Sequence, residues 1–223
     1  MNVLKLSLAA TAAAVALGAA SAASAAEVSY NVGAATDYVF RGVDQTGFGS
    51  EGQLFAGVDA TFEGNFYAGA WVSNTGPSGF GLFEADFYAG WKPALGPVTL
   101  DLGVIYYGYN SAGSGNSDYE VKLGGSVPAG PLSLGAAVYY GPDNDAFGGL
   151  DTYYVEGTAG FTYNKVAISA AIGNFSVDTL GDYNTWNLGA TVPVTETISF
   201  DARYIGTEAG GFTGAVATLK ATF

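Results

Sequence analysis

The sequence predicts an all-β fold: a transmembrane, antiparallel, up-and-down β-barrel of about twelve strands. Three observations lead to this prediction. From Glu27 onward the apolar residues recur with a period of two, and no apolar stripe of helical period stands out. The connections between these segments alternate between short and long, as they do in membrane barrels. The last residues, 215–223, alternate strictly between small or apolar and largely polar positions and end on Phe223.

The first 26 residues differ in character from the rest of the chain. Lys5 is followed by a run over residues 8–20 that is apolar apart from one threonine, and then by small residues at 24–26. This order is typical of a secretory signal peptide, so we expect cleavage after Ala26. The apolar run is too short to cross a bilayer as a helix, which takes about 20 residues. The barrel would then occupy residues 27–223 as one domain.

The period-two pattern divides this domain into twelve segments. The predicted strands cover residues 27–38, 50–62, 65–73, 80–92, 97–109, 116–126, 131–140, 151–163, 165–174, 181–192, 196–206 and 213–223. All seven prolines fall in connections or within a residue of a strand end, as expected because proline cannot donate to a ladder. An even number of strands places both termini at the end with the short turns. We expect the turns in the periplasm and the longer loops outside.

The charged residues of these strands fall on one face. The lipid-facing phase is set by apolar residues such as Leu102, and a base on that face at mid-bilayer costs about 2–4 kcal/mol. On the opposite phase lie seven carboxylates and three bases, which we predict to line the lumen. They are Asp59, Glu84, Asp86, Asp101, Glu120, Lys122, Glu156, Asp201, Arg203 and Lys220. The inward glycines, Gly69 and Gly90 among them, are expected to leave room inside the barrel.

Composition excludes several classes of function. Twenty acidic residues against seven basic ones make nucleic acid an unsuitable partner. The chain has no cysteine and no histidine, which excludes disulfides, thiolate or imidazole metal sites, and Ser-His or Asp-His catalysis. We expect no cofactor. The sequence also contains no run of 18 apolar residues of the kind that a membrane helix requires.

Two acidic groups have alternative interpretations. Glu84 and Asp86 share one face of a strand and could act as paired carboxylates, but such residues on a pore wall more often set its potential. The loop region around residues 141–150 carries Asp143, Asp145 and Asp151, which are oxygen ligands of the kind that Ca²⁺ takes. Their spacing matches no complete calcium loop, so solvated loop charges are the favoured interpretation.

A soluble secreted β-sandwich is the alternative fold, since short strands with glycine-rich turns also describe it. Such a sandwich would rarely end on an aromatic residue that lies in phase with the lipid-facing side chains. The position of Phe223 therefore favours the barrel.

Parts of the chain resemble two groups of known proteins. The final residues resemble the C-terminal signature of bacterial outer-membrane barrels, which implies that Phe223 is part of the signal for the barrel-assembly machinery. Residues 36–46, 65–74 and 84–91 read TDYVFRGVDQT, NFYAGAWVSN and EADFYAGW. They look like the N-terminal half of the TorF-like porin family of proteobacteria. This resemblance implies a barrel of porin type in the cell outer membrane, surrounded by its lipid.

The motif Asp37-Tyr-Val-Phe-Arg41-Gly42 also has an interpretation of its own. Asp37 lies on the inward phase of the first predicted strand, and Arg41 lies beyond it in a loop that Gly42 allows to bend sharply. Arg41 could pair with a carboxylate and fold the first loop into the mouth of the barrel. The alternative is a salt bridge that anchors the loop and has no role in transport.

The function that follows from these observations is passive. We predict a channel for small solutes or ions with a moderate preference for cations, and no enzymatic activity. The alternative is a non-conducting barrel whose lumen is filled, with a role in envelope structure or surface interaction. The number of strands does not decide between these two functions. Barrels of eight strands are filled by side chains and barrels of sixteen strands enclose an open channel, and a barrel of twelve strands lies between them.

Overall fold

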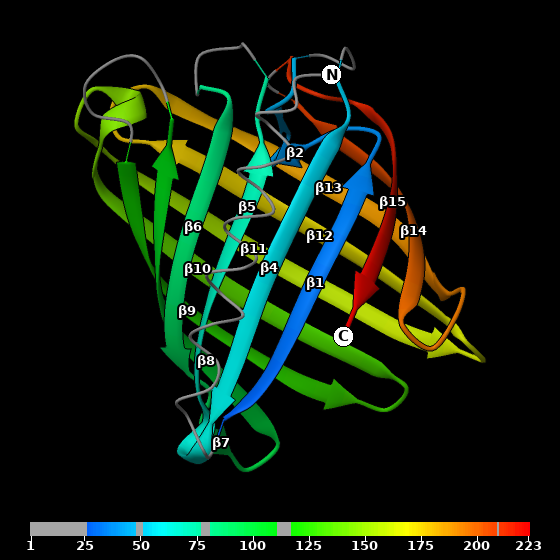
Figure 1. Ribbon diagram of the computed structural model, residues 1–223. Coiled ribbons are helices and arrows are strands. Elements are labelled where there is room, and N and C mark those ends of the chain that lie inside the picture. The colour runs from blue at the N-terminus through cyan, green and yellow to red at the C-terminus, as the bar shows by residue number, and fades with distance from the viewer. Residues whose placement is uncertain (1–25, 48–50, 77–80, 111–116, 209) are drawn as a thin grey trace.

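The computed structural model describes residues 26–47, 51–76, 81–110, 117–208 and 210–223. Within them twelve long antiparallel strands and the short β7 (Ala94–Leu95) form one closed sheet (Figure 1). The long strands are β1 (Glu27–Ala35), β4 (Gln53–Phe62), β5 (Phe66–Asn74), β6 (Phe83–Trp91), β8 (Val98–Tyr109), β9 (Ser117–Ala129), β10 (Leu132–Asn144), β11 (Leu150–Tyr163), β12 (Val166–Val177), β13 (Gly181–Pro193), β14 (Ile198–Thr207) and β15 (Gly214–Thr222).

The barrel closes between its first and last strands. β1 pairs with β15, with Ala34 opposite Leu219, and each other long strand pairs with its neighbours in sequence order. The predicted fold, an antiparallel barrel of twelve strands, is therefore confirmed. The predicted signal peptide lies outside the described residues, apart from Ala26, and stays a prediction.

The predicted strand ends differ from the observed ones mainly at the end of the barrel with the longer loops, which we call the loop end. β1 stops at Ala35 rather than at residue 38. The expected loop 175–180 was wrong, because hydrogen bonding between β12 and β13 continues to the pair Val177 and Gly181. β10 likewise runs on to Asn144, past an irregularity in its pairing with β11 that contains Pro142. Polar side chains at these strand ends hid the continuing ladders.

The opposite, turn end has short connections. Gly130 and Asn164 have φ values of 64° and 55°, a left-handed conformation that closes the tight turns between β9 and β10 and between β11 and β12. The turn between β4 and β5 is the one-turn helix η2 (Glu63–Asn65), and another, η3 (Asp145–Phe147), connects β10 and β11 at the loop end. None of the described helices is long and apolar enough to span a bilayer.

The outer surface of the barrel is apolar. Leu54, Ile172 and Leu188 are each about 60% exposed or more, and many other large apolar side chains of the strands are exposed in the same way. Along each strand these residues alternate with residues that point inward. So large an exposed apolar area is expected to face lipid rather than water.

Inward-pointing tyrosines lie across neighbouring glycines. The ring of Tyr88 occupies the space where Gly69 would carry a Cβ, and the ring of Tyr67 does the same at Gly90. The hydroxyls of these tyrosines donate hydrogen bonds to carboxylates, that of Tyr88 to Asp59 at 2.5 Å. The expectation that these glycines leave empty room was therefore wrong, because rings from adjacent strands fill it.

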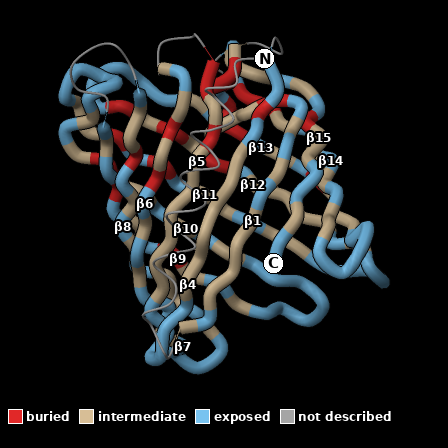
Figure 2. The backbone as a smooth tube through the Cα atoms, in the orientation of Figure 1, coloured by how far each residue is buried: buried red, intermediate tan, exposed pale blue. Residues whose placement is uncertain are grey.

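The buried residues gather at the loop end. Figure 2 shows them in the upper half of the barrel in that view, whereas the turn half is mostly exposed or intermediate. This uneven burial locates the part of the interior where side chains from different strands meet.

Candidate functional site

Residues 36–47 follow β1 and fold into the lumen at the loop end. We call them the inserted segment. It contains a hairpin of two short strands, β2 (Val39–Phe40) and β3 (Val43–Asp44). Figure 1 shows β2 near the loop end of the barrel. Arg41 and Gly42 form its tip with φ values of 48° and 80°. A Cβ on Gly42 would also lie 2.8 Å from that of Thr207, so this position requires glycine on both counts.

The base of the inserted segment is held by its own polar side chains. Thr46 is fully buried; its hydroxyl donates to Asp37 Oδ1 at 2.7 Å, and its backbone N–H donates to Asp44 Oδ1 at 2.7 Å. Burial raises the pKa of the Asp37 carboxyl above its ordinary value. Because β1 ends at Ala35, Asp37 lies within the inserted segment and not on the first strand as predicted.

The tip of the inserted segment reaches the far wall. Arg41 Nη1 and Nη2 donate to Glu120 Oε1 and Oε2 on β9 at 2.5 and 2.7 Å. Both side chains are buried, with exposed fractions of 8% and 5%. In the ring of twelve strands β10 lies opposite β1, and β9 is its neighbour. The inserted segment thus crosses the lumen, and its bidentate ion pair fixes the tip against the opposite wall.

Aromatic rings surround the guanidinium of Arg41. Its central carbon lies 4.4 Å from the ring centroid of Tyr154, 4.9 Å from that of Tyr139 and 5.8 Å from that of Phe175. Phe40, the neighbour of Arg41 in the segment, contributes a ring at 4.7 Å. Desolvated contacts of this kind favour a planar, delocalised cation.

A second contact region lies on β5 and β6. Tyr38 packs edge-on against Trp71 at 5.5 Å between ring centroids. Near it, Glu84 accepts a hydrogen bond from the Tyr109 hydroxyl at 3.0 Å and is 1% exposed. The buried oxygens Glu84 Oε2 and Asp86 Oδ1 have no hydrogen-bond donor. These two carboxyl groups lie against the inserted segment, not in open space.

Together these contacts fill much of the lumen at the loop end. Eleven of the twelve long strands contribute an inward residue that is buried at this level, and β1 leads directly into buried Asp37. The eleven residues are Gln53, Ser73, Glu84, Tyr107, Glu120, Gly141, Thr152, Phe175, Thr185, Thr207 and Val216. Among the described residues, these side chains and the inserted segment therefore leave little of the lumen surface exposed at this level.

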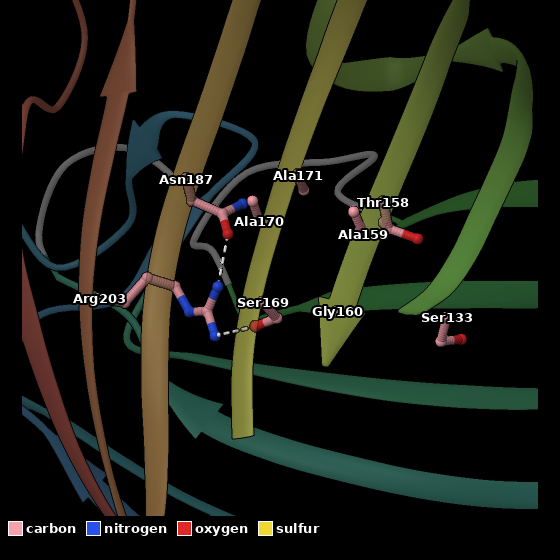
Figure 3. Close-up of a pocket in the computed structure, with 9 residues that line it drawn as sticks. All are labelled: Ser133, Thr158, Ala159, Gly160, Ser169, Ala170, Ala171, Asn187 and Arg203. Atoms are coloured by element: carbon pink, nitrogen blue, oxygen red, sulfur yellow. Dashed lines mark hydrogen bonds between the residues drawn. The ribbon is translucent and has the colours of Figure 1, made fainter. Parts of the chain in front are cut away.

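The turn half of the lumen is polar and more open. Lys122 Nζ pairs with Asp101 Oδ2 at 2.6 Å. Figure 3 shows Arg203, which donates to Asn187 and Ser169 at 2.5 and 2.9 Å. A cavity of about 320 Å³ lies beside Arg203. Another of about 230 Å³ lies between β14 and residues 37–39 on the underside of the inserted segment.

The ten predicted wall residues all lie on the strand phase opposite to the exposed apolar side chains. Three of them, Glu84, Asp86 and Glu120, gather around the inserted segment. Others pair nearer the turn end: Asp101 with Lys122, and Asp201 with Arg203 at 3.3 Å. Asp59 and Glu156 accept hydrogen bonds from tyrosines, and Lys220 stands apart on β15 with its side chain exposed. Whether these residues line a conducting path stays a prediction.

The remaining predicted residues lie elsewhere. Phe223 exchanges two backbone hydrogen bonds with Tyr30 at 2.9 and 3.0 Å, and its ring is 68% exposed. Asp151 accepts from the Tyr140 hydroxyl and from the backbone N–H of Asp143, whereas the backbone N–H of Asp145 donates to Asp118. No group of three or more acidic, histidine or cysteine side chains in the described ranges could hold a metal ion.

The sequence analysis missed the aromatic residues around Arg41. These residues lie on the inward phase of their strands, which the sequence pattern assigns mainly to charged side chains. They are Tyr107, Tyr139, Tyr154 and Phe175. The signal was present, because these rings occupy positions of the polar face and so do not belong to the outer aromatic girdles.

Comparison with known proteins agrees with this fold. The KdgM porin is similar, with a TM-score of 0.61 at 12% identity over 87% of this chain and 98% of that chain. The COG4313 outer membrane channel from Pseudomonas putida F1 has a TM-score of 0.47 at 10% identity, over 88% and 93% of the two chains. At such identities the first likeness concerns the fold alone, and the second carries no weight. No curated protein matches the chain in sequence.

One family model matches nearly the whole chain. It covers residues 19–222, and its description is "Bacterial protein of unknown function (Gcw_chp)". The description does not contain the TorF-like name of the resemblance noted above, so that finer assignment stays an expectation. The chain belongs to the Gcw_chp family of bacterial proteins.

Proposed function

We propose that the protein is a porin-like channel of the outer membrane, for passive diffusion of small solutes or ions, and that the inserted segment holds it closed at the loop end. The observation that carries this proposal is the way the lumen is filled. The wall residues of the turn half remain accessible, and among the described connections the closure is made by one segment, which Arg41 and Glu120 tie to the far wall. A closure made by a loop can be withdrawn without unfolding the barrel.

The membrane setting follows from the same features. The apolar outer surface requires a bilayer, and a signal peptide at residues 1–26 would deliver the chain to the periplasm. The likeness to the KdgM porin, a chain named as a porin, is compatible with this function. The loop end would face outward and the turn end the periplasm, and a relationship to TorF-like porins fits this arrangement.

No catalytic activity is part of the proposal. The chain has no histidine, and the carboxylate pair Glu84 and Asp86 is buried where a substrate has no access. The barrel-assembly machinery, lipid and small solutes or ions are the proposed partners, and nucleic acid is not among them. We propose no cofactor.

The competing function is a non-conducting barrel with a structural or surface role. The specific observation in its favour is the ring of buried residues at the loop end. Planar-bilayer recordings separate the two functions. A variant that lacks the tip of the inserted segment conducts if the barrel is a closed channel, and passes no current at any voltage if the lumen is permanently filled.

Ion preference is tested on such an opened variant. We expect moderate cation selectivity, because seven carboxylates and three bases lie on the inward phase and rings of carboxylates favour cations. Replacing Asp59→Asn together with Glu156→Gln, two inward carboxylates that are partly exposed, should move the reversal potential in a salt gradient toward neutrality. The preference should weaken as salt rises, since the Debye length falls from about 10 Å at 0.1 M to about 3 Å at 1 M. Anion selectivity before the double substitution would contradict this assignment.

Assembly is tested at the last residue. Deleting Phe223 removes the exposed terminal ring and the two backbone hydrogen bonds to Tyr30. We expect less heat-modifiable barrel in outer-membrane fractions, as judged by electrophoretic mobility before and after boiling. The conservative control Phe223→Trp keeps an aromatic ring and should assemble. If the deletion variant assembles as well as the unmodified protein, Phe223 is not part of the assembly signal.

A further inference from the structure

The surroundings of Arg41 form a binding site that belongs to the wall of the barrel. Apart from Phe40, the groups that contact its guanidinium come from four adjacent strands: Glu120 from β9, Tyr139 from β10, Tyr154 from β11 and Phe175 from β12. The inserted segment supplies the occupant, and the wall supplies the site.

Hydrogen bonds within the wall hold this site in shape. The hydroxyl of Tyr107 donates to Glu120 Oε2 at 3.0 Å, and that of Tyr154 lies 3.1 Å from Thr185 Oγ1 on β13. The Tyr154 ring also lies over Gly173, where it fills the space of the missing Cβ. None of these contacts involves the inserted segment, so the site should keep its geometry when the segment withdraws.

The chemistry of the site selects a planar cation. A carboxylate that accepts two parallel hydrogen bonds, enclosed by aromatic rings, matches a guanidinium better than a spherical ammonium. The buried side chains at this end of the described barrel include five carboxylates, namely Asp37, Asp44, Glu84, Asp86 and Glu120, against the single guanidinium of Arg41. An anionic solute would meet repulsion there.

Withdrawal of Arg41 would remove the counter-charge of Glu120 and expose this carboxylate among the aromatic rings. A planar cation that replaces Arg41 would restore the bidentate ion pair. Binding of such a cation and release of the inserted segment therefore favour each other.

We propose that Glu120, Tyr139, Tyr154 and Phe175 bind the guanidinium group of a solute, and that Arg41 is the internal occupant which this solute displaces. The inference rests on the proposed channel function in one respect: it names the class of solute that opens the channel and enters it. The site itself is independent of conduction.

The test is calorimetric and uses the full barrel, folded in detergent, with butylguanidine as the probe. Arg41→Ala empties the site, so this variant should bind butylguanidine at least about ten-fold more tightly than the unmodified protein, in which Arg41 competes. Butylurea, which has a similar shape but no charge, should not bind. Arg203→Ala, which removes an inward arginine from the turn half, should leave the affinity of the unmodified protein unchanged.

A second substitution assigns the site. Adding Glu120→Gln to Arg41→Ala should abolish the binding of butylguanidine, while circular dichroism and heat-modifiable mobility confirm that the barrel is folded. If Arg41→Ala does not fold, Arg41→Lys keeps the charge without the planar fork, and it should also bind the probe more tightly than the unmodified protein.

Three results would overturn the proposal: no binding to either Arg41 variant, equal binding of butylurea, or binding that survives Glu120→Gln. Bilayer recordings of the same samples separate this failure from failure of the channel function. If the samples conduct but do not bind butylguanidine, the guanidinium site is refuted and the channel function stands. If they bind butylguanidine but do not conduct, the site is supported and the channel function is refuted.

Discussion

Replacing Val39–Asp44 by two glycines is expected to turn a closed barrel into a conducting one. The change removes the β2–β3 hairpin and Arg41, and with them the contacts to Glu120 and the rings around it. The flanking residues are already close, since the N–H of Gln45 donates to the carbonyl of Tyr38 at 2.7 Å, so a short turn can join them. Single-channel recording in planar bilayers should show few or no openings for the unmodified protein and frequent openings for the variant.

The matched control changes the inserted segment without releasing it. Val43→Ala shortens an exposed side chain of the hairpin and leaves Arg41 and its ion pair in place, so this variant should stay closed. Silent recordings from the hairpin variant, with correctly folded protein in the bilayer, would show that the wall itself fills the lumen. That result would favour the structural role over the channel.

Replacing Leu102→Arg should prevent the barrel from folding into detergent or lipid. Leu102 lies in the middle of β8 on the outer phase, opposite Leu123 of β9, and a base at mid-bilayer on that face costs about 2–4 kcal/mol. Since whole domains are stabilised by only about 5–15 kcal/mol, this is a large loss. Folding is measured by heat-modifiable mobility and by recovery of β-structure on refolding.

Thr99→Arg is the control on the same strand. Thr99 lies on the inward phase near the turn end of β8 and is exposed in the lumen, so a base there meets water and nearby carboxylates such as Asp101. This variant should fold normally. Equal tolerance of both arginines would mean that the faces are wrongly assigned, because a slip of one residue exchanges the two faces of a strand.

Much of the fold could be predicted because a barrel has a simple sequence code. Apolar residues that recur at every second position locate the strands. The cost of placing a charge in lipid then shows which face of each strand points inward, so Asp59 or Lys122 can be placed in the lumen without knowing any contact. Strand ends were harder. Near the end of β12 the outward side chains become polar, as at Ser176, yet the ladder continues to Val177, because backbone hydrogen bonds do not require apolar side chains at the polar rim of the barrel.

The candidate site was predictable only in part. The sequence identified Arg41 as a residue that seeks a carboxylate, and Glu120 as an inward carboxylate, but 79 residues separate the pair. Their meeting depends on how far the inserted segment reaches across the ring, and that distance is set by the order of strands around the barrel. The enclosing rings of Tyr139, Tyr154 and Phe175 have the same origin, since they become neighbours only when β10, β11 and β12 pair.

The closure at the loop end is tested most directly by the reactivity of single cysteines, which a chain without cysteine makes unambiguous. Thr185 is 5% exposed at the level of the inserted segment, whereas Ser133 is exposed in the turn half of the same lumen. In the folded barrel, a water-soluble thiol reagent should modify Ser133→Cys readily and Thr185→Cys hardly at all, and removing residues 39–44 should bring the two rates together. Equal reactivity of the two cysteines with the inserted segment intact would contradict the closure.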